Sequence, residues 1–186
     1  MSPLPLTPSQ TVGPYLSIGL RWEDGPYVVA PGTPGAVWLR GRVLDGNGDV
    51  VPDALVETWQ ADPAGRFDHP DDPRGASGSG FCGFGRSETL DGEYAVLTVK
   101  PGQVPDAAGG LQAPHVDVSV FARGLLDRLV TRLYFADEPE ANARDQVLAG
   151  LPDDAARNTL LAQPCGDGYR LDIVLQGSDE SVFFAL

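Results

Sequence analysis

Residues 113–135 read APHVDVSVFARGLLDRLVTRLYF, and this stretch decides the fold class. Its first part, His115–Phe121 (HVDVSVF), alternates polar and apolar residues, a pattern typical of a strand with one buried face. Its last part, Leu129–Phe135 (LVTRLYF), is rich in the β-branched and aromatic residues that strands favour. The stretch therefore predicts two consecutive strands.

Similar strand patterns occur on the amino-terminal side of this stretch. Residues 36–44 (AVWLRGRVL) and 54–60 (ALVETWQ) flank a run of turn residues, DGNGD, so we expect them to form a β-hairpin. A further strand is predicted at Tyr94–Val99, after an Asp-Gly turn signal.

The carboxyl-terminal side predicts more strands and the few helices. Residues 138–163 favour one or two short helices, with Asp137 and Asp153 as candidate first-turn or capping acids. Strand patterns return at residues 169–175 and 181–185. The sequence therefore predicts an all-β fold, an antiparallel β-sandwich with long loops and short helices in the carboxyl-terminal third.

The length of 186 residues predicts a single domain that spans the whole chain, with an amino-terminal arm over about residues 1–35. Residues 62–85 are dense in Gly, Pro, Ser and Asp and predict one long loop. Loops of that length in a compact domain usually line a site or an interface.

Charge excludes two broad classes of partner. The chain has 26 acidic and 13 basic residues, a net charge of −13, which disfavours binding to nucleic acid or to an anionic membrane. No signal segment or membrane-length apolar run is present, so we expect a cytoplasmic protein. Cys82 and Cys165 lie far apart and outside any zinc-ligand spacing, so neither a zinc site nor a disulfide framework is indicated.

Three stretches together resemble the intradiol ring-cleaving dioxygenases. They are residues 7–15 (TPSQTVGPY), residues 41–67 (GRVLDGNGDVVPDALVETWQADPAGRF) and residues 113–135, and in order they extend over most of the chain. The resemblance implies a β-sandwich whose active members cleave a catechol ring between its two hydroxyls. It also implies a mononuclear non-haem Fe(III), held by two tyrosinates and two histidines, in those active members.

This chain departs from that ligand pattern at three of four positions. The two tyrosine positions correspond to Phe67 and to the segment after a Lys-Pro-Gly turn, at Val104, and the two histidine positions to His115 and Asp117. The resemblance thus implies no ferric centre and no catalytic residue in this chain. A weak metal remnant at His115 and Asp117 is the alternative to ordinary hydrogen-bonded residues, and His69 is expected to be solvated rather than a ligand.

Within the family, the protocatechuate-cleaving enzymes have two homologous chains, and only the β chain keeps the iron ligands. This sequence resembles the α chain, which implies an iron-bearing β subunit as partner, with Fe(III) in that subunit and protocatechuate and O₂ at the shared interface. The resemblance implies that Thr11, Gly13, Pro14 and Tyr15 face the partner's pocket. The alternative is an arm that is pinned to its own sheet, with Tyr15 as a packing residue.

Arg123 is the other substrate-binding residue that the resemblance implies, because a guanidinium there can offset the negative charge of the substrate. The alternative is a solvated arginine at a strand end, and Arg132 is a weaker candidate that we expect to be structural. Two other functions stay open: a self-sufficient enzyme with an altered metal site, and a β-sandwich binding module without enzymatic activity.

Overall fold

The two strands predicted first lie at the centre of the structure. We describe a computed structural model at residues 6–75, 80–106 and 109–185. Strands β8 (His115–Phe121) and β9 (Leu129–Phe135) have the predicted bounds and pair antiparallel, with His115 opposite Tyr134 and Asp117 opposite Arg132. The side chains of residues that face each other across a strand pair share one face of the sheet.

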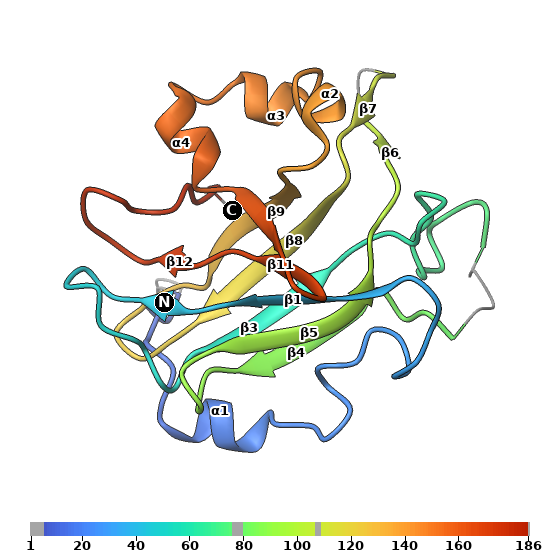
Figure 1. Ribbon diagram of the computed structural model, residues 1–186. Helices are drawn as coiled ribbons and strands as arrows, with labels where there is room; N and C mark the ends of the chain where they lie inside the picture. The colour runs from blue at the N-terminus through green and yellow to red at the C-terminus, as the bar shows by residue number, and fades with distance from the viewer. Residues whose placement is uncertain (1–5, 76–79, 107–108, 186) are drawn as a thin grey trace, which may run out of the picture.

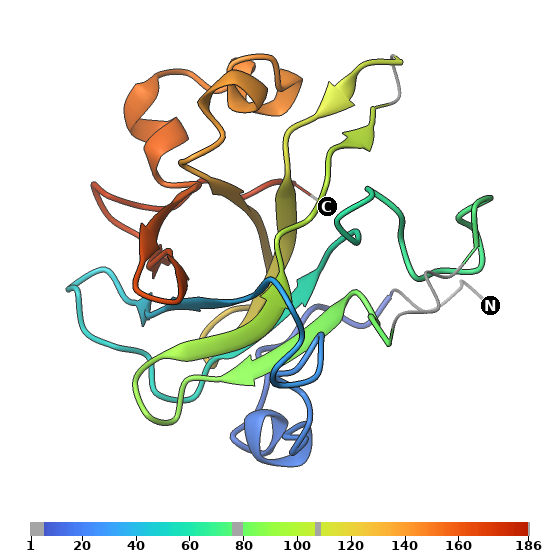
Figure 2. The ribbon, with the colours of Figure 1, turned by 45° about the vertical axis from the view of Figure 1, so that its right-hand side comes forward.

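β8 and β9 belong to an eight-stranded sheet with the order β4-β3-β8-β9-β10-β11-β1-β5. The sheet curls around its interior (Figure 2), and β10 forms the corner, since its first residues pair with β9 and its last with β11. The other six strands are β1 (Ala36–Gly41), β3 (Leu55–Trp59), β4 (Phe84–Glu88), β5 (Tyr94–Val99), β10 (Leu161–Cys165) and β11 (Gly168–Arg170).

The two ends of the curled sheet are joined by the amino-terminal segment. The amides of Arg86 in β4 and Leu97 in β5 donate to the carbonyls of Gly25 and Pro26, each at 2.8 Å. Residues 25–28 therefore lie between β4 and β5, which run side by side above α1 in Figure 1.

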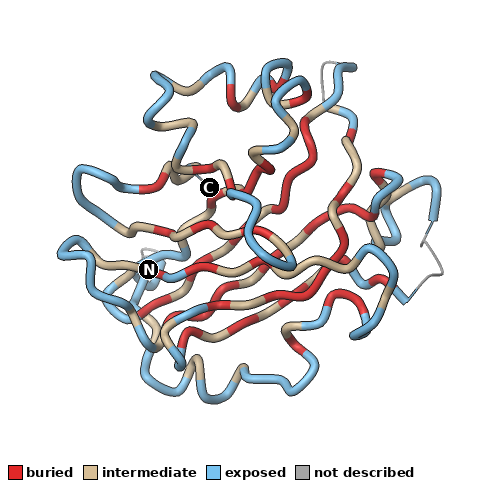
Figure 3. Tube along the Cα trace, viewed as in Figure 1, coloured by how far each residue is buried: buried red, intermediate tan, exposed pale blue. Residues whose placement is uncertain are grey.

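Two small sheets complete the strands. β2 (Val43–Leu44) pairs with β12 (Ile173–Val174), and β6 (Val104–Pro105) pairs with β7 (Leu111–Gln112). The main core lies inside the curl, as the buried positions along the central strands in Figure 3 show. Its inward-facing residues alternate along β8 as Val116, Val118 and Val120, which is why the polar residues of β8 all lie on the outer face.

The helices are short and gather at the two ends of the molecule (Figure 1). Helix α1 (Tyr15–Gly19) lies at one end, and α2 (Pro139–Asn142), α3 (Gln146–Ala149) and α4 (Asp154–Asn158) lie at the other. The predicted cap of α4 is confirmed, since the Asp153 side chain accepts from the amide of Ala156. The structure confirms the all-β class, with strands in large sheets and helices of at most five residues among those described.

The predicted hairpin between residues 36–44 and 54–60 is wrong. The DGNGD turn forms, with Leu44 bridged to Val50, but β1 pairs with β5 and β11, and β3 pairs with β4 and β8. The chain leaves the turn toward a different part of the sheet, where one edge of β3 pairs with β4 and the other with β8.

Other differences are smaller. Residues 181–185 form only a single bridge, between Phe184 and Val130, and the end of the predicted helical region is β10. No helix in the described ranges has the length and apolarity needed to cross a membrane. Cys82 and Cys165 are both exposed and unpaired.

Candidate functional site

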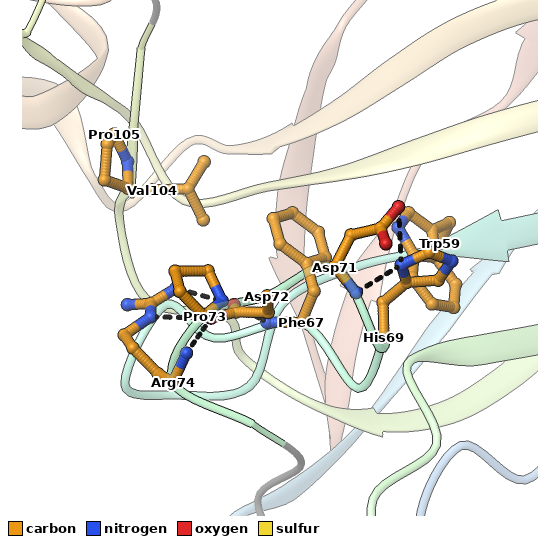
Figure 4. Close-up of a pocket in the computed structure, with 9 residues that line it drawn as sticks. All are labelled: Trp59, Phe67, His69, Asp71, Asp72, Pro73, Arg74, Val104 and Pro105. Carbon is orange, nitrogen blue, oxygen red and sulfur yellow. Dashed lines mark hydrogen bonds and ion pairs between the residues drawn. The ribbon is translucent and has the colours of Figure 1, made fainter.

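A pocket lies where β3 ends and the long loop begins. Its volume is about 700 Å³, and Figure 4 shows Phe67 between Val104 on one side and Trp59 with His69 on the other. The wall is mostly apolar, and its lining residues are Trp59, Phe67, His69, Asp71, Asp72, Pro73, Arg74, Val104 and Pro105. Two of the four positions implied as iron ligands, Phe67 and Val104, therefore line one pocket.

A close backbone approach brings these two positions together. Gly65 has a φ of 73°, and a Cβ at this position would lie 2.1 Å from the carbonyl oxygen of Gln103. Only glycine allows this contact between the loop and the segment before β6. Phe67 then stacks on Trp59, with ring centroids 6.0 Å apart and planes 8° from parallel.

The charged groups of the pocket are already paired. Arg74 donates to both carboxylate oxygens of Asp72, at 2.9 and 2.8 Å, and holds the pKa of that carboxyl well below its usual range. His69 is exposed, lies edge-on to Trp59 and accepts from the Asp71 amide through Nδ1. The expectation that His69 is a solvated residue agrees with this position.

The other two implied ligand positions lie on the outer face of β8, beside β9. His115, Asp117, Arg132 and Tyr134 form what we call the charged patch, because they are opposite pairs in the β8–β9 register. Arg132 donates through Nε to Asp117 Oδ1 at 2.8 Å, and through Nη1 to the Tyr134 hydroxyl at 3.2 Å. Trp59, a wall of the pocket, is the β3 partner of Asp117, so the charged patch and the pocket are adjacent.

Asp145 connects the charged patch to helix α3. It is fully buried, and its carboxylate accepts the amides of Ala113, Val147 and Leu148 at 2.8 to 3.0 Å. It also accepts the Tyr134 hydroxyl at 3.3 Å. This one carboxylate thus caps α3 and holds it against β9 and the start of β8.

Burial sets the ionisation of the patch. It lowers the pKa of His115, and the charge of Arg132 lowers it further, so His115 is neutral. Burial likewise raises the pKa of Tyr134 to about 12. A neutral tyrosine that is bonded to both Arg132 and Asp145 serves as a hydrogen-bonding bridge rather than as a tyrosinate ligand.

These residues do not fit a ferric ion. Phe67 and Val104 have no donor atom, and the carboxylate of Asp117 is neutralised by Arg132. Across the described ranges, no three His, Cys, Asp or Glu side chains are grouped so as to hold a metal. Ferric iron prefers hard anionic ligands, and this patch offers one neutral imidazole and one carboxylate that is already paired.

Four of the remaining predicted residues lie in the amino-terminal arm, and the fifth, Arg123, lies in the turn that follows β8. We call Thr11, Gly13, Pro14, Tyr15 and Arg123 the arm cluster. The Thr11 hydroxyl accepts the amide of Gly124 at 2.7 Å, which attaches the arm to the turn that contains Arg123. The six residue steps from His115 to Phe121 span about 20 Å along β8, so the turn that contains Arg123 lies far from the charged patch.

The arm cluster faces outward. Tyr15 is 80% exposed, so the alternative of Tyr15 as a packing residue of this chain is not what the structure shows. A Cβ on Gly13 would meet nothing within 4 Å, so nothing described in this chain requires glycine there. Arg123 is more than half exposed and pairs through Nε with Asp53, while in the described structure its two Nη groups make no hydrogen bond.

Comparisons with known proteins agree with this geometry. A sequence model of the family described as Dioxygenase matches residues 22–177. The chain is 44% identical to the protocatechuate 3,4-dioxygenase alpha chain of Pseudomonas putida, over 97% of this chain and 96% of that one. This chain belongs to the intradiol dioxygenase family.

Other family members are also similar. The chain is 41% identical to the protocatechuate 3,4-dioxygenase alpha chain of Burkholderia cepacia, over 99% of both chains. It is 39% identical to the beta chain from the same organism, over 76% of this chain and 64% of that one. This chain is thus similar to both the alpha and the beta chains of protocatechuate 3,4-dioxygenases.

Solved structures share the fold. The dioxygenase domain of a carbohydrate-binding fusion protein from Streptomyces sp. SirexAA-E superposes with a TM-score of 0.56 at 28% identity, covering 92% of this chain and 99% of that one. Catechol 1,2-dioxygenase from Pseudomonas arvilla C-1 superposes with a TM-score of 0.60 at 22% identity, covering 81% of this chain and 55% of that one. This second likeness shows the fold alone.

Arg132 and Asp145 are more central in the structure than the sequence indicated. Arg132 was expected to be structural, and it is, but its bond to Asp117 at an implied ligand position was not foreseen. The signal was available, because a hairpin that pairs β8 with β9 places these residues opposite each other. Asp145 had no such signal, because its partners lie in three separate segments.

Proposed function

We propose that this chain is the non-catalytic α subunit of an Fe(III)-dependent protocatechuate 3,4-dioxygenase. The complex would cleave protocatechuate with O₂ to 3-carboxy-cis,cis-muconate, with the iron held by a homologous β subunit. One observation carries the proposal: the chain keeps the fold and length of α-chain relatives, yet Asp117, at an implied ligand position, is bonded to Arg132.

The exposed surface of the arm supports a partner. In the described part of the chain, large apolar side chains that face solvent are frequent between residues 6 and 27, and they are Leu6, Tyr15, Ile18, Trp22 and Tyr27. Apolar side chains exposed along one segment are candidates for burial against a partner, since exposed apolar patches commonly mark protein interfaces. We therefore assign this surface to the contact with the β subunit.

The arm cluster would complete the partner's pocket. Pro14 fixes its own φ, and the absence of a side chain on Gly13 leaves the backbone accessible to a flat aromatic ligand. The Tyr15 hydroxyl and the Nη groups of Arg123 are the polar groups offered to the substrate carboxylate. When bound in the partner, the ferric ion supplies Lewis-acid chelation of the catechol oxygens, and this chain contributes position and charge only.

Co-expression tests the proposal. The chain should be purified alone and together with a homologous chain that carries two Tyr and two His ligands, and iron content and ring cleavage should be measured in both samples. We expect no stoichiometric iron, no tyrosinate-to-iron visible band and no cleavage from the chain alone, and all three from the complex. Cleavage by the isolated, iron-loaded chain would instead support a self-sufficient enzyme.

A further inference from the structure

The charged patch contains a histidine whose geometry is that of a metal ligand. His115 Nδ1 lies 2.8 Å from the carbonyl oxygen of Ala113. Because a carbonyl only accepts, Nδ1 carries the hydrogen and Nε2 of the neutral ring has a free lone pair. Histidine ligands in metal sites are commonly held in this way, by a carbonyl that fixes the tautomer and the ring orientation.

The lone pair of His115 faces a carboxylate that is already occupied. Asp117 Oδ1 lies 4.0 Å from His115 Nε2, and the same oxygen accepts from Arg132 Nε at 2.8 Å. The guanidinium is also fixed by Nη1, which donates to Gln112 Oε1 at 2.8 Å. A permanent positive charge, bonded to Asp117, Gln112 and Tyr134, is thus held beside His115 and Asp117.

We propose that Arg132 is the residue that keeps metal cations out of the charged patch, and that His115 is a preformed ligand there. Arg132 acts in two ways, by repelling a second cation at short range and by using the lone pairs of Asp117. Arg132 Nε lies 2.8 Å from Asp117 Oδ1, which is itself 4.0 Å from His115 Nε2. A positive charge this close to a partly buried site is expected to lower its affinity for a cation by at least tenfold. This inference does not depend on a partner subunit.

The test compares two variants of the full-length chain. Asp117→His places two imidazoles two residues apart on the same face of β8, a pair that suits a divalent transition metal. Asp117→His should bind Co²⁺ weakly or not at all, whereas Asp117→His with Arg132→Gln should bind one Co²⁺ at least tenfold more tightly. Calorimetric titration and the visible Co²⁺ bands measure this, and adding His115→Ala should abolish the binding.

A charge control separates electrostatics from shape. Asp117→His with Arg132→Lys keeps the positive charge but loses the planar fork, and we expect it to resemble Asp117→His alone. Equal affinity with Arg132 and with Gln at position 132, including no binding in either variant, would overturn the proposal. Tight binding with Lys but not with Arg would also overturn it, since charge would then not be the cause.

A second measurement applies if the Asp117→His variants do not fold. Arg132→Gln alone leaves His115 and Asp117 as the ligands, and Zn²⁺ binding is followed by the ¹⁵N shifts of the imidazoles. The chain has two histidines, so His69 serves as the internal reference. A Zn²⁺-dependent shift of His115 Nε2 in the variant and not in the unaltered chain supports the proposal, and the same response in both contradicts it.

Discussion

The two ends of strand β8 have opposite designs. At the His115 end, the polar groups of the charged patch are bonded to one another and to Asp145, and His115 and Tyr134 are buried while Asp117 and Arg132 are partly exposed. At the Arg123 end, the arm cluster is exposed, and it is fixed to the fold through Thr11 and Asp53. Residues that serve this chain's own stability are thus separated from residues that are available to another molecule.

The largest effect should come from removing the hydrogen bonds of Asp145 at the His115 end of β8. Asp145→Ala removes four accepted hydrogen bonds from a fully buried carboxylate, and we expect it to lower the free energy of unfolding by about 3–5 kcal/mol. Denaturant unfolding followed by circular dichroism measures this. Asp153→Ala is the matched control, because it removes an exposed helix cap and should cost about 1 kcal/mol.

The next largest effect should come from Arg123→Ala, which tests substrate binding at the Arg123 end of β8. If Arg123 meets the substrate carboxylate, its loss should raise KM for protocatechuate of the assembled complex by about 10- to 100-fold, the value of a charged hydrogen bond. Iron content should not change. Arg128→Ala removes the same charge from the same turn and should leave KM near that of the unaltered complex; an equal rise in both variants would indicate long-range charge instead.

Gly13→Ala should affect the activity of the complex but not the stability of this chain. Because the added methyl meets nothing in this chain, the free energy of unfolding of the isolated chain should change by less than about 1 kcal/mol. In the complex, kcat/KM should fall several-fold, since the methyl would enter the shared pocket. Iron content and subunit association of the complex should be unchanged, which separates an effect on the shared pocket from a failure to assemble.

The smallest effect is a pH dependence that arises from His115. Its pKa is lower in the folded chain than in the unfolded chain, so the unfolded chain binds the proton first as pH falls below about 6.5. The stability present above that pH is lost as pH falls toward the folded pKa. His115→Gln should therefore reduce the dependence of unfolding free energy on pH between about 7 and 5, as denaturation at several pH values would show.

The sequence predicted strands well and their partners poorly. β8, β9 and β5 have the predicted bounds, because alternation and β-branched residues are local signals. β4 was not predicted, since Phe84–Glu88 reads FGRSE and lies within or beside a loop composition. The false hairpin at the DGNGD turn has the same origin: a turn signal fixes a reversal of the chain but not which distant strand lies alongside.

The site was predicted by position rather than by contact. The sequence indicates an incomplete set of iron ligands at Phe67, Val104, His115 and Asp117. In the structure, the first two line an apolar pocket, and Asp117 is bonded to Arg132. The role of Arg132 and Asp145 depends on side chains that meet across β8, β9 and α3, and no local pattern encodes such meetings. Arg123 was expected from resemblance, whereas its pairing with Asp53 required the fold.

The attachment of the arm at two points has a consequence for assembly. Thr11 is tied to the β8–β9 turn, and residues 25–28 are held between β4 and β5, so α1 and Tyr15 lie in a segment whose two ends are already fixed. A segment that is ordered before association loses little conformational entropy when a partner binds. The arm is thus preorganised, and its apolar side chains can contribute more of their burial to affinity than those of a free tail would.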